Sequence, residues 1–466
     1  MDVIVTKLSK KGEGIALSQD REIFIPQVLV GEKLKVEVGE PFAVGSARCP
    51  GKVISIIEPS IERNDKIACP YYGTCGGCQL MHMKDSAQIE LKRSDIKEAL
   101  EQVALKLKKS PKAVSLDFLK LNIAMVSNEI DDQVVRFKSI RYFGEQDNKL
   151  IHGFYIARSH KVVAIDSCCQ EPRSFGPLAC SLTATLNELK APLSSATSSS
   201  SWGVKALQLR QGEHHDNLTV LLIVTGKVPE SVKASLQSWA QAQHISSCYL
   251  GYNNQTGNSL YCEQVELIWG ERFIIKNING LNFKLGPQTF MQVNYPMTQK
   301  LYQSAIDHAV SKSSHERSWG LDLCCGVGTM TLALATKLNQ VTGVEIVSES
   351  IASAQENAAL NHINNAHFIV GDIKNVLPGL LKGEQKEHLS ALIADPSRAG
   401  LGESCAALIG RIKGPCAVSL IFCSLSALQR DLPIVLKAGF TITKIQGFDM
   451  FPHSKHIETL VCLTKD

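Results

Sequence analysis

The sequence has no long apolar run and no strong excess of charge of either sign. Its 49 lysines and arginines nearly balance its 45 aspartates and glutamates, which leaves a formal net charge of +4. No uninterrupted apolar segment reaches the roughly 20 residues that a membrane-spanning helix needs. These absences argue against a membrane partner and against a uniformly basic polyanion binder. Any nucleic-acid site must therefore come from a local cluster of cations.

The N-terminal segment also lacks the charged region and apolar core of a secretory signal peptide. We therefore expect a cytoplasmic protein, and we expect it to be a monomer. A reducing compartment makes a disulfide framework unexpected for the 15 cysteines of this 466-residue chain. Three roles remain for them, which are buried structural cysteine, metal ligand and nucleophile.

A chain of this length predicts two or three domains. Residues 1–58 alternate apolar and polar side chains between glycine turns, which predicts a small β-barrel of the oligonucleotide-binding type. We expect a mixed α+β central domain over 59–278, whose helix at about 85–109 can pack on the following domain. Residues 279–466 alternate helices with short apolar strands, which predicts a Rossmann-like α/β domain. The serine-rich run at 193–201 is expected to form a flexible surface loop.

One segment of the C-terminal domain joins a strand to a helix through a glycine turn. Gly326 and Gly328 make the turn, and glycine there allows a ligand to approach the backbone closely. Glu345 ends the next strand about 20 residues further on, where a carboxylate can bind ribose hydroxyls. The dinucleotide fingerprint requires a third glycine where this chain has Thr331. S-adenosylmethionine, which has a ribose but no pyrophosphate, therefore fits this turn better than a dinucleotide.

Two neighbouring strands of the predicted sheet end in chemically useful residues. Cys423 follows the apolar strand at 417–422, and Asp395 follows the strand at 391–394. Taken singly, a strand-end cysteine is more often structural and an Asp-Pro is often only a turn. Together with Glu458, which precedes the last strand, they suit methylation of carbon 5 of uracil. A thiolate adds to carbon 6 and activates carbon 5, one carboxylate holds the base, and another removes the carbon-5 proton.

At these positions the chain resembles the RNA uracil-C5 methyltransferases, over essentially its whole length. The resemblance rests on separated segments in one order, which are 290–294, 322–331, 395–398, 423–431 and 449–458. It implies a class I, Rossmann-like methyltransferase domain that binds S-adenosylmethionine. It also implies methylation of carbon 5 of a uridine in RNA through a covalent bond between Cys423 and carbon 6 of uracil.

The resemblance assigns roles to individual residues. It implies that Cys423 is the nucleophile, Glu458 the general base and Asp395 a catalytic residue that also contacts the methyl donor. It places Phe290 near the target base. The implied donor contacts are Gln292, Cys324, Gly326, Gly328, Thr329, Glu345, Asp372 and Asp395.

The sequence departs from the family pattern beside two of these residues. Ser397 replaces the second proline of an Asp-Pro-Pro-Arg motif, and Phe422 and Ser424 flank the cysteine where the family has serine and asparagine. The thiol, both carboxylates and the glycine turn are retained, which favours an active enzyme. The altered neighbours leave open a shifted substrate and a catalytically inactive RNA-binding protein.

A second group of cysteines lies far from the reacting residues in the sequence. Cys69, Cys75 and Cys78 fall within ten residues of a polar, glycine-rich segment, which fits poorly with buried structural cysteine. With Cys168, or its neighbour Cys169, they provide four thiolates for zinc or an iron–sulfur cluster. The arrangement resembles the [4Fe-4S] site of the branch that methylates 23S ribosomal RNA (RlmD). Radical S-adenosylmethionine enzymes differ, because their first cysteine spacing is three residues and here it is five.

Cations and aromatic residues alternate between 136 and 143. Arg136, Phe137, Lys138 and Arg141 are candidate RNA contacts, because cations bind phosphates and aromatic faces stack on unpaired bases. An ordinary basic hairpin on a solvated face is the alternative. The N-terminal barrel resembles a TRAM domain, with its turn at 12–16. Barrel and cysteine group together favour 23S ribosomal RNA as the substrate, with transfer RNA as the alternative.

Overall fold

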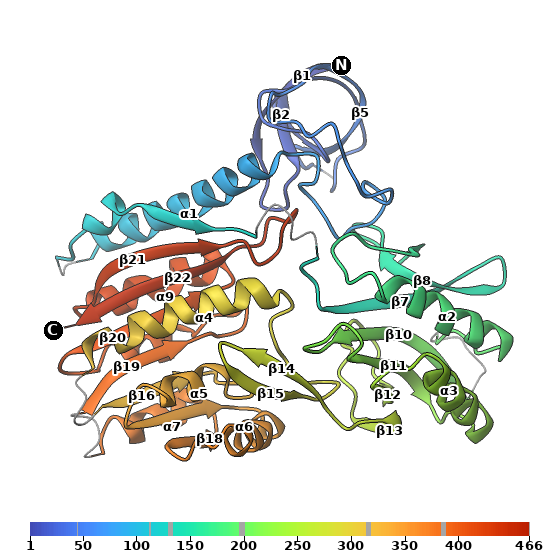
Figure 1. Cartoon of the computed structure of the whole chain (residues 1–466). Coiled ribbons are helices and arrows are strands. Elements are labelled where there is room, and N and C mark those ends of the chain that lie inside the picture. Colours follow the sequence, from blue (N-terminus) through green and yellow to red (C-terminus); the bar gives the residue numbers. More distant parts are fainter. Residues whose placement is uncertain are drawn as a thin grey trace.

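The structure is a computed structural model that describes residues 1–43, 45–110, 113–128, 134–194, 201–313, 318–383 and 388–465 (Figure 1). Most of the serine-rich run that was predicted to be a loop, residues 195–200, lies outside these ranges. Within them, no helix combines the length and the apolar character that crossing a membrane requires.

The N-terminal strands close into a barrel in the order β1-β2-β3-β5-β4. Alternate residues of each strand point inward, so that Val3, Val5, Ile23, Ile25 and Leu34 form the barrel core. The alternation of the sequence therefore predicted this barrel correctly. Its strands are β1 (Asp2–Leu8), β2 (Gly14–Ser18), β3 (Arg21–Ile25), β4 (Lys33–Val38) and β5 (Arg48–Glu58).

A seven-stranded sheet occupies the centre of the chain, in the order β13-β12-β11-β10-β7-β8-β9. The helices α2 (Phe175–Glu188) and α3 (Glu230–Ala242) pack on it through a shared apolar cluster that includes Leu182 and Leu236. The strands are β7 (Lys138–Gln146), β8 (Lys149–Tyr155), β9 (Val162–Ala164), β10 (Trp202–Gln211), β11 (Leu218–Gly226), β12 (Ser247–Tyr252) and β13 (Gln264–Gly270).

The C-terminal sheet has eight strands in the order β18-β17-β16-β19-β20-β22-β21-β6. Adjacent strands from β18 to β20 run parallel, and β22 runs antiparallel to both β20 and β21. The predicted Rossmann-like arrangement is confirmed. The strands are β6 (Ile123–Val126), β16 (Trp319–Leu323), β17 (Gln340–Glu345), β18 (Ala366–Val370), β19 (Leu389–Ala394), β20 (Cys416–Phe422), β21 (Thr441–Phe448) and β22 (Glu458–Lys465).

Helices cover both faces of this sheet. One apolar cluster joins it to α4 (Tyr295–Ala309), α5 (Thr329–Ala335) and α6 (Ser348–Leu360). The opposite cluster joins it to α7 (Ile373–Leu380), α8 (Glu403–Ile409) and α9 (Leu425–Lys437). The strands β19 and β20 are covered on both sides, and they consist almost entirely of buried apolar residues. In the part of the chain that the structure describes, the remaining elements are the 3-10 helices η1 (Asp117–Lys120) and η2 (Val310–Lys312) and a hairpin of β14 (Ile274–Ile278) and β15 (Leu281–Leu285).

The long helix α1 (Asp85–Lys108) packs on the C-terminal sheet, although it precedes the central sheet in sequence (Figure 1). Its residues Ile96, Leu100 and Val103 belong to the same cluster as α9. Further along, β6 adds a parallel edge strand to β21, with Ile123 opposite Ile445. The sequence analysis anticipated that this helix can pack on the C-terminal domain, but no pattern in the sequence indicated the edge strand. The division into domains at 58 and 278 stays a prediction.

Candidate active site

The parallel strands β16, β19 and β20 end side by side at one edge of the C-terminal sheet. Leu323 pairs with Ala394, and Ala394 pairs with Leu420. The residues that follow these strands are therefore neighbours, although about a hundred positions separate the first from the last. Ligands bind at this edge in open α/β sheets. The edge carries the glycine turn, Asp395 and Cys423, as their places in the sequence predicted.

Cys423 is half-buried, and its sulfur contacts the carbonyl oxygen of Pro396 at 3.9 Å. Burial raises the pKa of its thiol to about 11, and the negative charges of Glu458 and Asp395 act in the same direction. Arg398 opposes them. The thiol is thus predominantly neutral near pH 7, so an attack by this sulfur requires a change in its surroundings or an acceptor for its proton.

Glu458 begins β22, which runs antiparallel to β20. Thr459 pairs with Phe422, so Glu458 lies beside the end of the strand that carries Cys423. Only 3% of Glu458 is exposed, and its Oε2 atom has no hydrogen-bond partner among the described residues. Burial raises the pKa of this carboxyl well above its ordinary value, and the negative charge of Asp395 adds to the effect. A carboxyl with a raised pKa can accept a proton near neutral pH, as a general base must.

Asp395 follows β19 directly, and the Gln292 side chain lowers its pKa less than burial raises it. Burial, reinforced by the charge of Asp322, raises the pKa of Asp395 to about 7. Gln292 is 8% exposed, whereas Phe290 on the same segment is 70% exposed. The segment thus exposes the Phe290 ring and buries the Gln292 amide, and the roles predicted for both stay predictions.

Two residues of this edge were not identified from the sequence. Tyr302 on α4 is buried, and burial raises the pKa of its phenol well above the ordinary value. The negative charges of Asp395 and Glu458 act in the same direction. Asp322 is fully buried in β16; its Oδ2 accepts a hydrogen bond of 2.6 Å from Thr331, and its Oδ1 has no partner within the part of the chain that the structure describes. Tyr302 resembles any core residue of an amphipathic helix. Asp322 could have been identified from the sequence, because a carboxylate inside an apolar strand is rare.

The glycine turn has the backbone geometry that the sequence predicted. Cys324, Gly326 and Gly328 have φ angles of 65°, 53° and 86°. A Cβ atom added at Gly326 would meet nothing within 4 Å, so open space lies beside this residue. Glu345 accepts hydrogen bonds from the backbone nitrogens of Gly326 at 3.2 Å and Ile346 at 2.8 Å. The turn and the acid are therefore joined by a hydrogen bond.

Two further predicted donor contacts lie at helix starts on the same half of the sheet. Thr329 is the first residue of α5, directly after Gly328. Asp372 caps α7, where its carboxylate accepts a hydrogen bond of 3.0 Å from the backbone nitrogen of Lys374. The Lys374 side chain also lies 3.0 Å from this carboxylate and holds the pKa of Asp372 below its ordinary value. Asp372 is therefore ionised over the physiological range.

The five cysteines of the second group line one cavity of about 300 Å³. They are Cys69, Cys75, Cys78, Cys168 and Cys169. The backbone nitrogen of Gly77 donates a hydrogen bond of 3.4 Å to the Cys75 sulfur. In the part of the chain that the structure describes, no three His, Cys, Asp or Glu side chains adopt the geometry of metal ligands. The convergence of soft thiol donors on one cavity nevertheless fits a thiolate-bound group in chemical terms.

The structure corrects one predicted RNA contact. Arg141 is 0% exposed, and its guanidinium binds Glu171 at 2.5 Å and the Ile165 carbonyl at 2.8 Å. The prediction of a surface contact was wrong, because this cation neutralises a buried acid. Arg136 lines the cysteine cavity.

The other two predicted contacts are partly exposed. Phe137 stacks on Tyr295 with 5.0 Å between ring centroids. Burial, together with the charge of Arg210, lowers the pKa of Lys138 to about 7. Both therefore stay candidates, although each side chain already has neighbours inside the protein.

Comparisons with known proteins agree with this geometry. A model of the tRNA (uracil-5-)-methyltransferase family matches residues 271–466. An uncharacterized RNA methyltransferase of Halalkalibacterium halodurans is 30% identical over 465 residues, which cover 99% of this chain and 96% of that protein. One of Thermosynechococcus vestitus is 29% identical, covering 100% and 98%.

Among solved structures, the tRNA (uracil-54, C5)-methyltransferase of Pyrococcus abyssi, in complex with S-adenosyl-L-homocysteine, has a similar fold. Its TM-score is 0.72 at 20% sequence identity, with 99% of this chain and 100% of that chain covered. The likeness therefore extends over the barrel and the central sheet as well as the C-terminal sheet.

Proposed function

The chain belongs to the RNA uracil-C5 methyltransferase family and is an S-adenosylmethionine-dependent methyltransferase, and from this premise we propose that it methylates carbon 5 of a uridine in 23S ribosomal RNA. One observation carries the chemical part of the proposal. Strand order and register bring Cys423, Asp395 and Glu458 to the edge that also holds the glycine turn. Their pKa values are all raised by burial, which is common where titratable groups do chemistry.

In the proposed reaction, the Cys423 thiolate adds to carbon 6 of uracil, and the ring electrons move toward carbon 5 and the carbonyl at carbon 4. S-adenosylmethionine supplies the methyl group that carbon 5 takes up. Glu458 then removes the proton from carbon 5. The carbon 5–carbon 6 double bond re-forms as the thiolate leaves, so the cysteine ends as it began. The uridine must leave its stack for both faces of the ring to be reached.

Asp395 and Gln292, whose side chain acts on the pKa of that carboxyl, would hold the polar edge of the base and the donor. The carboxylate of Glu345 would bind the ribose of the donor, and the open space at Gly326 lets the donor lie against the backbone. Phe290, which is 70% exposed, offers a ring on which the extruded base can stack.

We assign the cysteine-lined cavity to a [4Fe-4S] cluster held by Cys69, Cys75, Cys78 and Cys168, with Cys169 as the alternative fourth ligand and zinc as the alternative group. The thiols that line the cavity support this assignment. Such a cluster would tie the segment at 69–78 to the one at 168–169, and this is the structural contribution we propose for it.

The choice of ribosomal RNA rests on the barrel and the cysteine group together, a combination that resembles the 23S-specific branch. Transfer RNA is the alternative substrate, because TRAM-like barrels also occur in enzymes that act on transfer RNA. RNA as the substrate also supports a location in the cytoplasm.

Methylation of deproteinised cellular RNA with labelled donor, followed by mapping of the product, tests the proposal. We expect 5-methyluridine in 23S RNA. Label confined to transfer RNA would contradict the ribosomal assignment but not the chemistry. Cys423→Ala should abolish labelling while donor binding persists, and Cys180→Ala, which changes a partly exposed cysteine elsewhere, is the matched control.

A further inference from the structure

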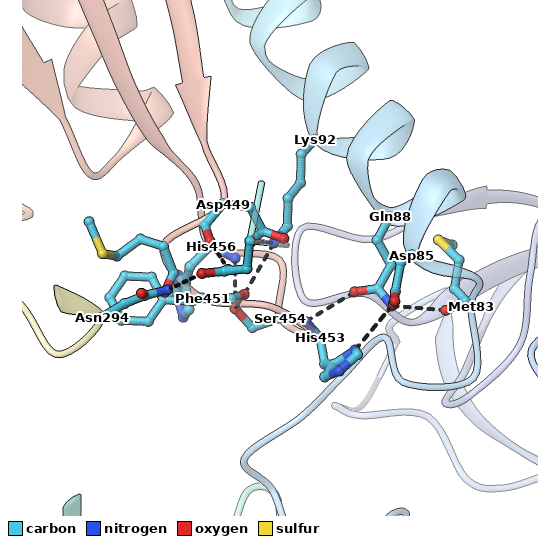
Figure 2. A network of polar contacts seen from close by, with 12 residues as sticks. Met83, Asp85, Gln88, Lys92, Asn294, Asp449, Phe451, His453, Ser454 and His456 are labelled. Carbon is cyan, nitrogen blue, oxygen red and sulfur yellow. Dashed lines mark hydrogen bonds and ion pairs between the residues drawn. The ribbon is translucent and has the colours of Figure 1, made fainter. Parts of the chain in front are cut away.

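The loop at 449–457, called the base loop below, joins β21 to β22 and leads directly into Glu458. One oxygen of the Glu458 carboxylate is buried, and no described residue forms a hydrogen bond with it. Its position is therefore set largely by the backbone of β22 and of the base loop. Side chains of α1 and Asn294 contact this loop (Figure 2), and backbone nitrogens directly after Cys78 also bond to it.

The first contact comes from Lys92, in the middle of α1. Its ammonium lies 2.5 Å from Asp449 Oδ1 and donates a hydrogen bond of 3.1 Å to the Phe451 carbonyl. The side chains of Lys92 and Asp449 are 0% and 7% exposed. Burying an ion pair costs desolvation energy that the pair seldom regains, so it is a poor device for stability alone. It does fix the start of the base loop at two points.

The second contact comes from Gln88, one turn earlier on α1. Its Oε1 accepts a hydrogen bond of 3.0 Å from the His453 backbone nitrogen, and its Nε2 lies 3.2 Å from His453 Nδ1. His453 has a φ of 61°, a conformation that non-glycine residues adopt only when their surroundings hold them there. The His453 carbonyl accepts hydrogen bonds of 2.8 Å from the backbone nitrogens of Gln79 and Leu80. The segment directly after Cys78 thus also holds the backbone at His453.

The third contact comes from the segment that bears Gln292. Asn294 caps α4, and its Nδ2 donates hydrogen bonds of 3.1 Å to the Met450 carbonyl and to Asn128 Oδ1. Asn128 in turn donates one of 3.1 Å to the Asp449 carbonyl. The base loop is therefore fastened between α1, the cysteine-bearing segment and the segment at 290–294.

We propose that Lys92 and Gln88 are positioning residues, which act through the base loop to place the Glu458 carboxylate for proton removal from carbon 5. Neither side chain bonds to Glu458, Cys423 or Asp395, so neither is a catalytic residue. Each instead fixes a backbone point of the loop, at 449–451 and at 453. This inference rests on the proposed function, because it gives Glu458 the role of general base.

The experiment compares the variants Lys92→Met and Gln88→Leu with the parent enzyme. It measures formation of the covalent bond separately from complete turnover. Trapping on RNA that contains 5-fluorouridine measures formation of the covalent bond, since fluorine cannot leave as a proton. Turnover on unmodified RNA also requires the base. We expect trapping rates within about twofold of the parent enzyme and turnover lowered about tenfold or more, because small misplacements of a reacting group are costly. Covalent complex with unmodified RNA should accumulate on denaturing gels.

Glu90→Gln is the matched control, because it breaks an exposed ion pair with Arg93 on the same helix. It should change neither rate. Equal losses of trapping and turnover in both variants, or unchanged turnover in both, would overturn the proposal. If Lys92→Met does not fold, Gln88→Leu decides alone, since it leaves the buried ion pair intact. Failure of the parent enzyme to trap fluorinated RNA would instead contradict the proposed function.

Discussion

The sulfur of Cys423 lies 3.9 Å from the carbonyl oxygen of Pro396, so the thiol stands against the corner that follows Asp395. Two strands that end at the same edge produce this contact, with Leu420 on β20 paired to Ala394 on β19. The same arrangement places two carboxyls near the thiol and makes its ionisation unfavourable. A raised thiol pKa has consequences that can be measured.

The reactivity of Cys423 should rise steeply with pH. The pKa of its thiol is raised to about 11, and only the thiolate is nucleophilic, so alkylation by iodoacetamide should increase about tenfold per pH unit below that value. Replacing Arg398 by Gln removes a charge that lowers this pKa, and should shift the profile to higher pH. Mass spectrometry of the peptide that contains Cys423 measures the rate.

The control for that shift is Arg411→Gln, which removes an exposed cation elsewhere in the C-terminal domain. It should leave the profile in place. A Cys423 profile that levels off near pH 7 would show that the thiol ionises far more easily than its buried, acid-lined surroundings imply.

Glu458→Gln should leave covalent bond formation intact and block its resolution. Glutamine has nearly the shape of glutamate but cannot accept the carbon-5 proton, so methylated RNA should stay attached to Cys423. Denaturing gels with labelled RNA would show the complex accumulate. Glu403→Gln, at an exposed carboxylate, should turn over normally.

Turnover by the unchanged enzyme should also depend on pH. The Glu458 pKa is raised, so the carboxyl is protonated and inactive as a base below that pKa, and resolution should speed up as pH rises through it. Rapid product release by Glu458→Gln at every pH would assign the base role to another group.

The residues that the sequence placed correctly are those that local patterns determine. An apolar strand followed by a polar residue fixes where that residue lies in a parallel sheet, and this rule located Cys423, Asp395 and Glu345 at one edge. No local pattern indicated that β6 would pair with β21, because Ile123 and Ile445 are remote in sequence. Arg141 was misassigned for the same reason, since its buried partner Glu171 lies thirty positions away and resembles any surface acid.

Arg141→Met should therefore destabilise the central sheet rather than weaken RNA binding directly. The change leaves Glu171 buried without its cation, and breaking a buried pair in this way costs about 3–5 kcal/mol. Urea denaturation measures the loss. Glu171→Gln combined with Arg141→Met removes both charges and should recover part of it. An RNA affinity that falls in folded Arg141→Met, with unchanged unfolding free energy, would restore Arg141 as an RNA contact.

The assignment of the cysteine-lined cavity can be tested by the metal content of the protein and of its cysteine variants. Protein purified without oxygen should carry about four iron atoms and matching sulfide per chain if four of these thiolates hold a [4Fe-4S] cluster. Cys78→Ser should lose them, because serine is a poor ligand for this group, whereas Cys180→Ser should not. Cys180 lies outside the cavity, with its sulfur 3.8 Å from Asp166. Comparing Cys168→Ser with Cys169→Ser then identifies the fourth ligand, since only the true ligand is needed for full iron content. Stoichiometric zinc in place of iron, lost on the same substitutions, would show that the same thiolates bind a different metal.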